Sequence, residues 1–356
     1  MSAAAETQLE AAPRVEARGV GPRWGLAAGA FLVGSLLVGL AVGPLGIGSG
    51  AILRSALSAV PLLHVHSGIS PVDHAVLWEI RAPRVVLAAL VGGMLSVAGA
   101  SYQGVFRNPL CDPYLLGVAG GAGLGATLAI VYGAVATGNS STVPLAAFAG
   151  AIAAVALTYA LGRSAGARST ASLVLAGVTM ATFTAAVQTF VQQRHTEQLQ
   201  SVYSWLLGGF STSTWGDVAV AAPYVAASSL VLVAHRRVLD VLSLGDDEAA
   251  SLGLNVGRTR LLVVAVATLG TAAAVAVSGL IAFVGIIVPH TVRLLVSTSY
   301  RAVLPLSFVV GAGFLVLTDV LARTVLSPAE LPIGVVTAFF GAPFFAVVLR
   351  TSRSLR

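Results

Sequence analysis

Long runs without any charged residue are the feature that most limits how this chain can fold. Most are close in length to the about 20 apolar residues that an α-helix needs to cross a bilayer, and the longest is about twice that. The composition agrees, with 56% hydrophobic and 10% charged residues, against about 25% charged residues in soluble domains. We therefore predict a membrane protein. The runs are 24–53, 85–106, 114–162, 169–193, 218–234, 261–292, 302–318 and 331–349.

Two of these runs are too long for one helix. Residues 138–141 form a polar Gly-Asn-Ser-Ser turn inside 114–162, and Pro144 follows it, as is typical of a break between helices. The run 261–292 also divides into two. The sequence thus predicts an all-α, polytopic fold with a membrane domain at 24–350. The ten expected helices are 24–43, 85–106, 114–133, 143–162, 170–193, 218–235, 261–281, 283–297, 302–324 and 333–350.

The distribution of basic residues supports ten spans. All twenty basic residues are arginine, and arginine accumulates in cytoplasmic loops. With both termini inside, only Arg54, Arg81, Arg84, Arg194 and Arg323 fall outside or near the outer face. We expect cytoplasmic tails at 1–23 and 351–356 and a location in the cytoplasmic membrane. The net charge of +6 is explained by these loops and by contact with acidic lipid, so no nucleic acid partner is expected.

Several kinds of chemistry are missing from the sequence. A P-loop needs a lysine to reach the terminal phosphates, and the chain contains none. Metalloprotease, serine hydrolase and CxxC patterns are also absent. His64 and His66 lie in one predicted outer segment, where solvated histidines are a simpler interpretation than a metal site. We therefore expect no enzyme activity, no cofactor and no bound metal.

An ion-coupled carrier is the alternative function. Such carriers bury ionisable groups near the bilayer midplane. Only Asp319 lies inside a predicted span, and Arg323 follows it at the i+4 position. A structural ion pair between Asp319 and Arg323 is the favoured interpretation, and a coupling acid is the other.

Glycines and a rigid turn mark the third helix. Gly117, Gly121 and Gly125 follow the GxxxGxxxG spacing, which allows two helix backbones to approach closely. Close packing is the main interpretation, and a moving helix contact is the alternative. In the turn before it, Asp112 is expected to cap the helix, with Pro113 in its first turn.

Two polar patterns accompany other helices. Thr184, Gln188 and Gln192 recur every four residues and so share one helix face, which we expect to meet either another helix or a wet translocation path. The S-P-A-E sequence at 327–330 has the spacing of a capping box and is predicted to open the last helix.

One of the expected cytoplasmic loops contains an acidic segment. Asp246, Asp247 and Glu248 suit the first turn of a short helix, and Ala249, Leu252 and Gly253 form its small-residue face. A cytosolic helix that docks a protein and an ordinary loop helix are both consistent with this pattern.

Four motifs together resemble the FecCD family, the permease subunits of bacterial ABC importers. They are RAPRVVLAALVGGMLSVAGASYQGVFRNPLCDPYLLGV (81–118), LSLGDDEAASLGLNVGR (242–258), GLIAFVGIIVPHTVRLLV (279–296) and DVLARTVLSPAELPIGVVTAFFGAPFF (319–345). They occur in family order, and the likeness extends from about residue 78 to 350. Cys111 stands where the commoner motif has alanine.

The resemblance implies a type II ABC importer permease fold and a set of partners. These are a second permease subunit, with a homodimer expected, two cytosolic ATPase subunits and an external substrate-binding protein. It also implies that the segment 245–254 is the coupling helix that contacts the ATPase. Arg81, Arg84 and Arg323 match the positions that receive glutamates of the binding protein. Interfacial anchoring is the alternative for Arg81 and Arg84.

The resemblance implies a metal chelate as cargo. Iron(III)–siderophore is the first expectation, and haem and cobalamin are the others. The loop 163–169 is an expected inner constriction.

Overall fold

The computed structural model describes residues 20–43, 48, 50, 54–55, 70–133, 142–164 and 170–353. Within these ranges, seven helices are long and apolar enough to cross a membrane, and three shorter helices are also apolar. Each of the ten predicted spans corresponds to one of them. The long helices are α1 (Pro22–Ala41), the continuous helix Pro71–Phe106, α7 (Thr142–Ser164), α8 (Thr170–Arg194), α10 (Trp215–Ala234), α13 (Val256–Ser278) and α15 (Tyr300–Thr324).

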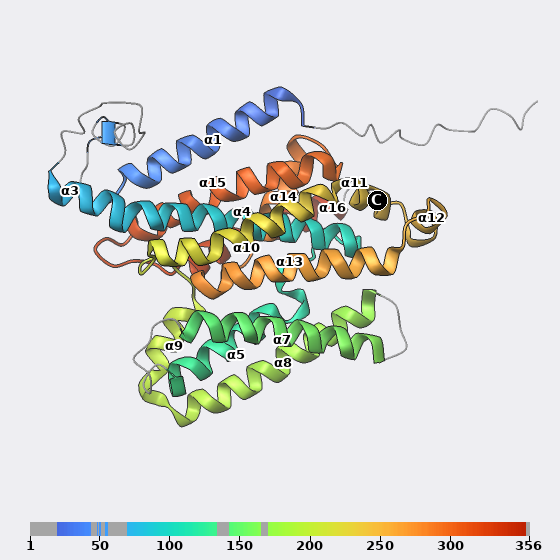
Figure 1. The fold of residues 1–356 in the computed structure, drawn as a ribbon, viewed down its shortest axis with the longest axis horizontal. Helices are drawn as coiled ribbons and strands as arrows, with labels where there is room; N and C mark the ends of the chain where they lie inside the picture. The colour runs from blue at the N-terminus through green and yellow to red at the C-terminus, as the bar shows by residue number, and fades with distance from the viewer. Residues whose placement is uncertain are drawn as a thin grey trace, which may run out of the picture.

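The shorter apolar helices include α14 and α16, and short polar helices connect the spans. Figure 1 shows the long helices side by side, with α3 (Pro71–Ala75) and α12 (Asp246–Ser251) at opposite ends of the bundle. We call these the α3 end and the α12 end. Further helices are α14 (Val284–Leu295), α16 (Ile333–Arg353), η4 (Thr196–Gln198), α9 (Leu199–Leu206), α11 (Arg236–Leu242) and α12 (Asp246–Ser251).

The second predicted helix, 85–106, begins too late. The structure joins α3 (Pro71–Ala75), the π-helical η1 (Val76–Arg81) and α4 (Ala82–Phe106) into one helix. The backbone N–H of Ala82 donates to the carbonyl of Leu77, a wider turn than that of an α-helix. This π-turn comes directly before Pro83, which would otherwise break a regular helix. The charges before residue 85 therefore lie on a helix.

The third predicted helix, 114–133, is divided. It starts as the 3₁₀ helix η2 (Pro113–Leu116), turns at Gly117, and continues as α5 (Val118–Leu128) and the π-helical η3 (Ala129–Gly133). The predicted cap is confirmed, because Asp112 Oδ1 accepts a 2.8 Å hydrogen bond from the Tyr114 N–H. Gly117 has φ +88°, which favours glycine.

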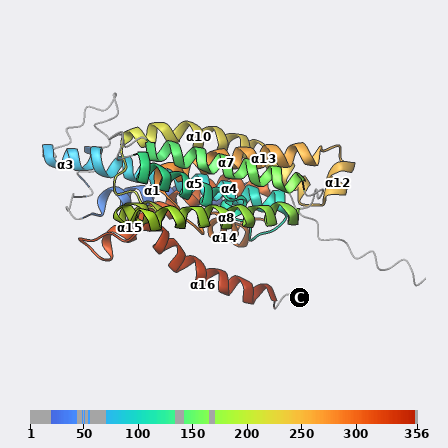
Figure 2. The ribbon, with the colours of Figure 1, turned by 90° about the horizontal axis from the view of Figure 1, so that it is seen from below.

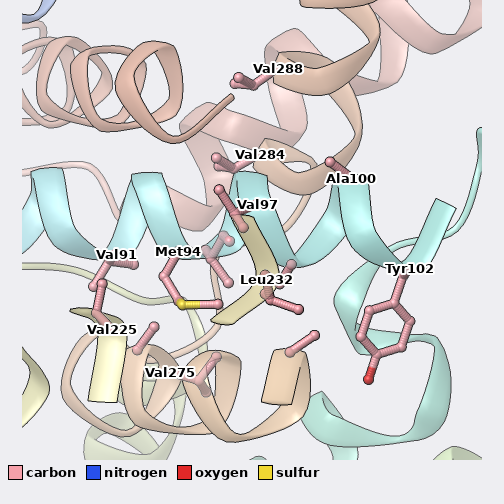
Figure 3. Close-up of a cluster of buried hydrophobic side chains, with 14 of the residues drawn as sticks. Val91, Met94, Val97, Ala100, Tyr102, Val225, Leu232, Val275, Val284 and Val288 are labelled. Atoms are coloured by element: carbon pink, nitrogen blue, oxygen red, sulfur yellow. The ribbon is translucent and has the colours of Figure 1, made fainter. Parts of the chain in front are cut away.

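The core is built around α4, which is buried along almost its whole length. It packs against α15, α13, α14 and α10. Figure 3 shows this core, where Met94 and Val97 of α4 lie among Val225 of α10, Val275 of α13 and Val284 of α14.

Three further helices form a second group beside the core. α5, α7 and α8 pack on one another, and α7 also contacts α13; Figure 1 shows them as a separate group below the core. α16 projects away from the bundle (Figure 2). It extends to Arg353, so the predicted tail at 351–356 begins inside this helix. At the other terminus α1 begins at Pro22, and residues 1–19 of the predicted tail lie outside the described residues.

Candidate functional site

A cluster of buried charges lies at the α3 end of the bundle. Arg84 of α4 donates from Nε and Nη2 to Asp319 of α15, at 2.8–3.0 Å. Its Nη1 and Nη2 also donate to the two carboxylate oxygens of Glu330, at 2.9 and 3.0 Å. Arg84 is therefore held by two carboxylates in a bidentate manner, the strongest geometry for this pair. The cluster joins α4, α15 and the segment before α16.

The predicted pair of Asp319 and Arg323 is present but secondary. Arg323 Nε lies 3.6 Å from Asp319 Oδ2, which is longer than the contacts from Arg84. The Nη2 of Arg323 instead donates to the carbonyl of Gly39 in α1. The i+4 spacing identified the local pair, but Arg84 lies 235 positions away in sequence and only the fold brings it close.

The three arginines predicted to dock a binding protein are buried. Arg81, Arg84 and Arg323 are only 4–7% exposed. Arg81 Nη1 donates to the carbonyls of Leu40 and Ala41 at the end of α1, at 2.9 and 3.1 Å. All three guanidinium groups are thus engaged within the chain.

The predicted capping box at 327–330 is wrong. The last helix begins at Ile333, and Glu330 accepts from Arg84. The side chain of Glu330 is 40% exposed, so it covers Arg84 from the solvent side. The carboxylate of Glu330 therefore pairs with the buried Arg84 and does not cap the last helix.

At the α12 end, the acidic segment forms the predicted short helix. Its first turn contains Asp246, Asp247 and Glu248. The helix ends in a Schellman motif: Gly253 has φ +85°, and Leu254 donates its backbone N–H to the carbonyl of Ala249 at 3.0 Å. Glycine is favoured at this left-handed position.

Two arginines hold α12 against the bundle. Asp246 Oδ1 lies 3.2 Å from Arg107 Nη2 and 3.1 Å from Arg260 Nη2. The side chains of Asp246 and Arg107 are each 43% exposed, so this pair is partly solvated and contributes little to stability. The side chain of Arg260 is only 10% exposed, so the second pair is more enclosed.

The predicted small-residue face of α12 is divided between two sides. Ala249 is fully buried against the bundle, whereas Leu252 is 66% exposed. A Cβ built at Gly253 meets no atom within 4 Å. Asp247 and Glu248 are exposed too. The outward surface of α12 therefore carries acids and one leucine, and Ala249 only anchors the helix.

A polar network beside α12 was not identified from the sequence. Gln103 of α4 donates to the carbonyls of Cys111 and Gly285, at 3.2 and 3.0 Å. Its Oε1 accepts from Arg293 of α14. In the sequence, only Arg293 within the motif 279–296 pointed to this network. No spacing around Arg293 indicated what it binds.

The polar stripe on α8 faces α5 along part of its length. Thr184 is buried beside Gly120, and the Oε1 of Gln188 is near Gly123. Gln192 is half-buried. These contacts favour the first alternative, a helix contact, for Thr184 and Gln188.

Two of the three predicted packing glycines lie at a close helix contact. A Cβ at Gly121 would clash with the carbonyl of Gly150, and one at Gly125 with that of Ala146, both in α7. Gly117 precedes α5 and forms the turn instead, so the expected three-residue stripe is reduced to two.

Some expected features lie outside the described residues. These are His64, His66 and positions 165–169 of the expected inner constriction. In the part of the chain that the structure describes, no three His, Cys, Asp or Glu side chains form a group that could hold a metal ion.

The chain belongs to the FecCD transport family, whose family model matches residues 31–351. The cobalamin import permease BtuC of Halobacterium salinarum is 39% identical over 92% of this chain and 95% of its own length. The hemin transport permease HmuU of Yersinia pestis is 37% identical over 79% of this chain and 85% of its own. A solved structure, an inward-facing putative metal-chelate type ABC transporter, superposes with a TM-score of 0.81 at 31% identity. It covers 93% of this chain and 100% of its own. The fold is thus that of an ABC importer permease.

Proposed function

We propose that this chain is the membrane permease subunit of an ATP-driven importer that moves a metal chelate into the cell. The family match across residues 31–351 is the observation that carries the proposal. The absence of lysine from the chain removes the P-loop route to ATP hydrolysis, so the energy would come from a separate ATPase. We place the protein in the cytoplasmic membrane with both termini inside.

We assign α12, within the segment 245–254, as the contact with that ATPase. Asp247, Glu248 and Leu252 are exposed on it, and Asp246 fixes it to α4 and α13 through two arginines. A force on α12 would therefore reach both helices. This arrangement supports a coupling role more than an isolated loop helix.

A second copy of the chain is the proposed partner of α16. Phe339 is 75% exposed and Phe340 is 52% exposed on this projecting helix, and Figure 2 shows it apart from the bundle. A homodimer would cover these rings. Of the three residues predicted to line the path, Gln192 is our remaining candidate, because Thr184 and Gln188 contact α5.

We propose that the binding protein docks at the α3 end, where its acids compete with Glu330. Glu330 already supplies Arg84 with the kind of group that a docking glutamate would offer. Because it is 40% exposed, it is the member of the cluster that a partner reaches first. Arg81 and Arg323 are buried in the same part of the bundle.

Iron(III)–siderophore is our first candidate cargo, as the motifs imply. Cobalamin is the second, because the relative that matches 92% of this chain is named for cobalamin import. Haem is supported by the hemin permease. An ion-coupled carrier is disfavoured because Asp319, the acid inside a span, is engaged by Arg84 and Arg323.

Reconstitution tests this function. Proteoliposomes would contain the chain with its ATPase, and the loaded binding protein would be added on the outside. We expect ATP-dependent uptake of one chelate among ferric siderophore, cobalamin and haem. Uptake driven by a proton or sodium gradient without the ATPase would instead establish the ion-coupled alternative.

A further inference from the structure

A polar pocket opens beside α12 and has no assigned role. Its volume is about 230 Å³. It lies where the end of α4, the turn after it, α14 and the start of α15 meet. The lining residues used below are Gln103, Arg107, Pro109, Ser243, Arg293 and Tyr300.

Arg293 is the distinctive group in this pocket. It is half-buried and donates to Gln103 Oε1 and, at 3.4 Å, to the Tyr300 hydroxyl. Its guanidinium carbon lies 5.5 Å from the centre of the Tyr300 ring. All of these partners are neutral. Among the residues that the structure describes, no carboxylate lies within ion-pair distance of Arg293.

The nearby acids are engaged elsewhere. Asp240 accepts from the Tyr300 N–H at 2.6 Å and from the Ser299 hydroxyl at 2.9 Å. Asp246 pairs with Arg107 and Arg260. A partly desolvated cation without an acid is costly, and an incoming carboxylate would remove that cost.

The surface around the pocket fits a protein better than a free anion or a lipid. Leu110, Leu244 and Leu252 are 41%, 60% and 66% exposed. The first two adjoin pocket residues Pro109 and Ser243, and the third lies on α12. Exposed apolar residues around a recessed arginine are typical of protein interfaces.

We propose that an acidic side chain of the ATPase subunit enters this pocket and pairs with Arg293. The inference rests on the proposed function, and it adds a second anchor beside α12. Arg107 lines the pocket and also pairs with Asp246, so the two contacts form one continuous surface. Through Gln103 the second anchor reaches the carbonyls of Cys111 and Gly285, and hence α14.

The test compares three variants of the full chain in nanodiscs, using the purified ATPase subunit of the same importer. Arg293→Gln removes the cation. Ser243→Phe narrows the mouth from an exposed position and leaves Arg293 in place, which guards against misfolding of the first variant. Arg301→Gln is the control, because Arg301 lies nearby but faces Asp240 at 3.6 Å. Dissociation constants are measured at low and high salt.

We expect Arg293→Gln and Ser243→Phe each to weaken ATPase binding at least tenfold, with a smaller salt dependence for Arg293→Gln. Arg301→Gln should bind as the wild type does. If both pocket variants bind like the wild type, the inference is overturned while the proposed function stands. If Arg293→Gln weakens ATPase binding only in nanodiscs that contain anionic lipid, a headgroup occupies the pocket and the inference is also wrong. Failure of the wild-type chain to bind the ATPase would reject the proposed function itself.

Discussion

At the α3 end of the bundle Arg84 is buried and paired with two acids, whereas at the α12 end Asp246 and Arg107 pair with 43% of each side chain exposed. The cluster at the α3 end links α4 to α15 through a contact shielded from water. The cluster at the α12 end attaches the six-residue helix α12 to the bundle. The cluster at the α3 end is thus largely enclosed, whereas the pair of Asp246 and Arg107 is partly solvated. The same residue types thus serve different purposes at the two ends.

The largest expected effect comes from removing the buried acid. Asp319→Ala leaves Arg84 and Arg323 buried with less compensation, and breaking a buried pair costs about 3–5 kcal/mol. We expect a loss of this order in the free energy of unfolding in detergent micelles. The double variant Arg84→Met with Asp319→Leu should lose less, because it removes both charges. Wild-type stability of Asp319→Ala would show that the α3 end is not a structural cluster.

Reversing a charge at the α12 end should affect ATPase binding more than stability. Asp246→Arg removes the partly exposed pair with Arg107 and places a like charge beside Arg260, whose side chain is 10% exposed. Because Asp246 itself is 43% exposed, the free energy of unfolding should fall by less than in Asp319→Ala. Binding of the ATPase should nevertheless weaken at least tenfold, because α12 loses its fixed position. Glu197→Arg changes an exposed acid outside α12 and serves as the control. A large loss of stability in Asp246→Arg with normal ATPase binding would reverse the comparison.

The smallest expected effect concerns the one exposed member of the buried cluster. Glu330→Gln leaves Arg84 paired with Asp319, so stability should change by about 1 kcal/mol or less. The variant frees donors of Arg84, and we expect the binding protein to bind a few times more tightly, measured with the permease in nanodiscs. Weaker binding would mean that Glu330 itself contacts the partner.

Local patterns in the sequence predicted much of this structure. The features that depend on contacts between residues far apart in the sequence were not predicted. Uncharged runs placed the ten helices, because span length follows from bilayer thickness. The acidic first turn of α12 and the Asp112 cap are also local features, and both were predicted. The start of the second helix was missed because a π-turn carries the chain through Pro83.

The ion cluster shows where sequence reasoning stopped. The i+4 spacing of Asp319 and Arg323 suggested their pair, but the partner with shorter contacts, Arg84, approaches from another helix. Glu330 was assigned to a helix cap because its spacing from Ser327 matches a capping box. That spacing does not reveal that Arg84, from another helix, binds the same carboxylate. Arg293 had no local pattern at all, and its isolation from acids is visible only in the fold.

The account depends most on the two ends facing opposite sides of the membrane, and cysteine labelling measures this directly. The native Cys111 is buried, and burial raises the pKa of its thiol to about 12, so it should react little near neutral pH. Glu330→Cys and Leu252→Cys then report on the α3 and α12 ends. In intact cells a membrane-impermeant thiol reagent should label Glu330→Cys alone. Leu252→Cys should react only after permeabilisation and be protected by the ATPase. Labelling of Leu252→Cys from outside intact cells would contradict the account.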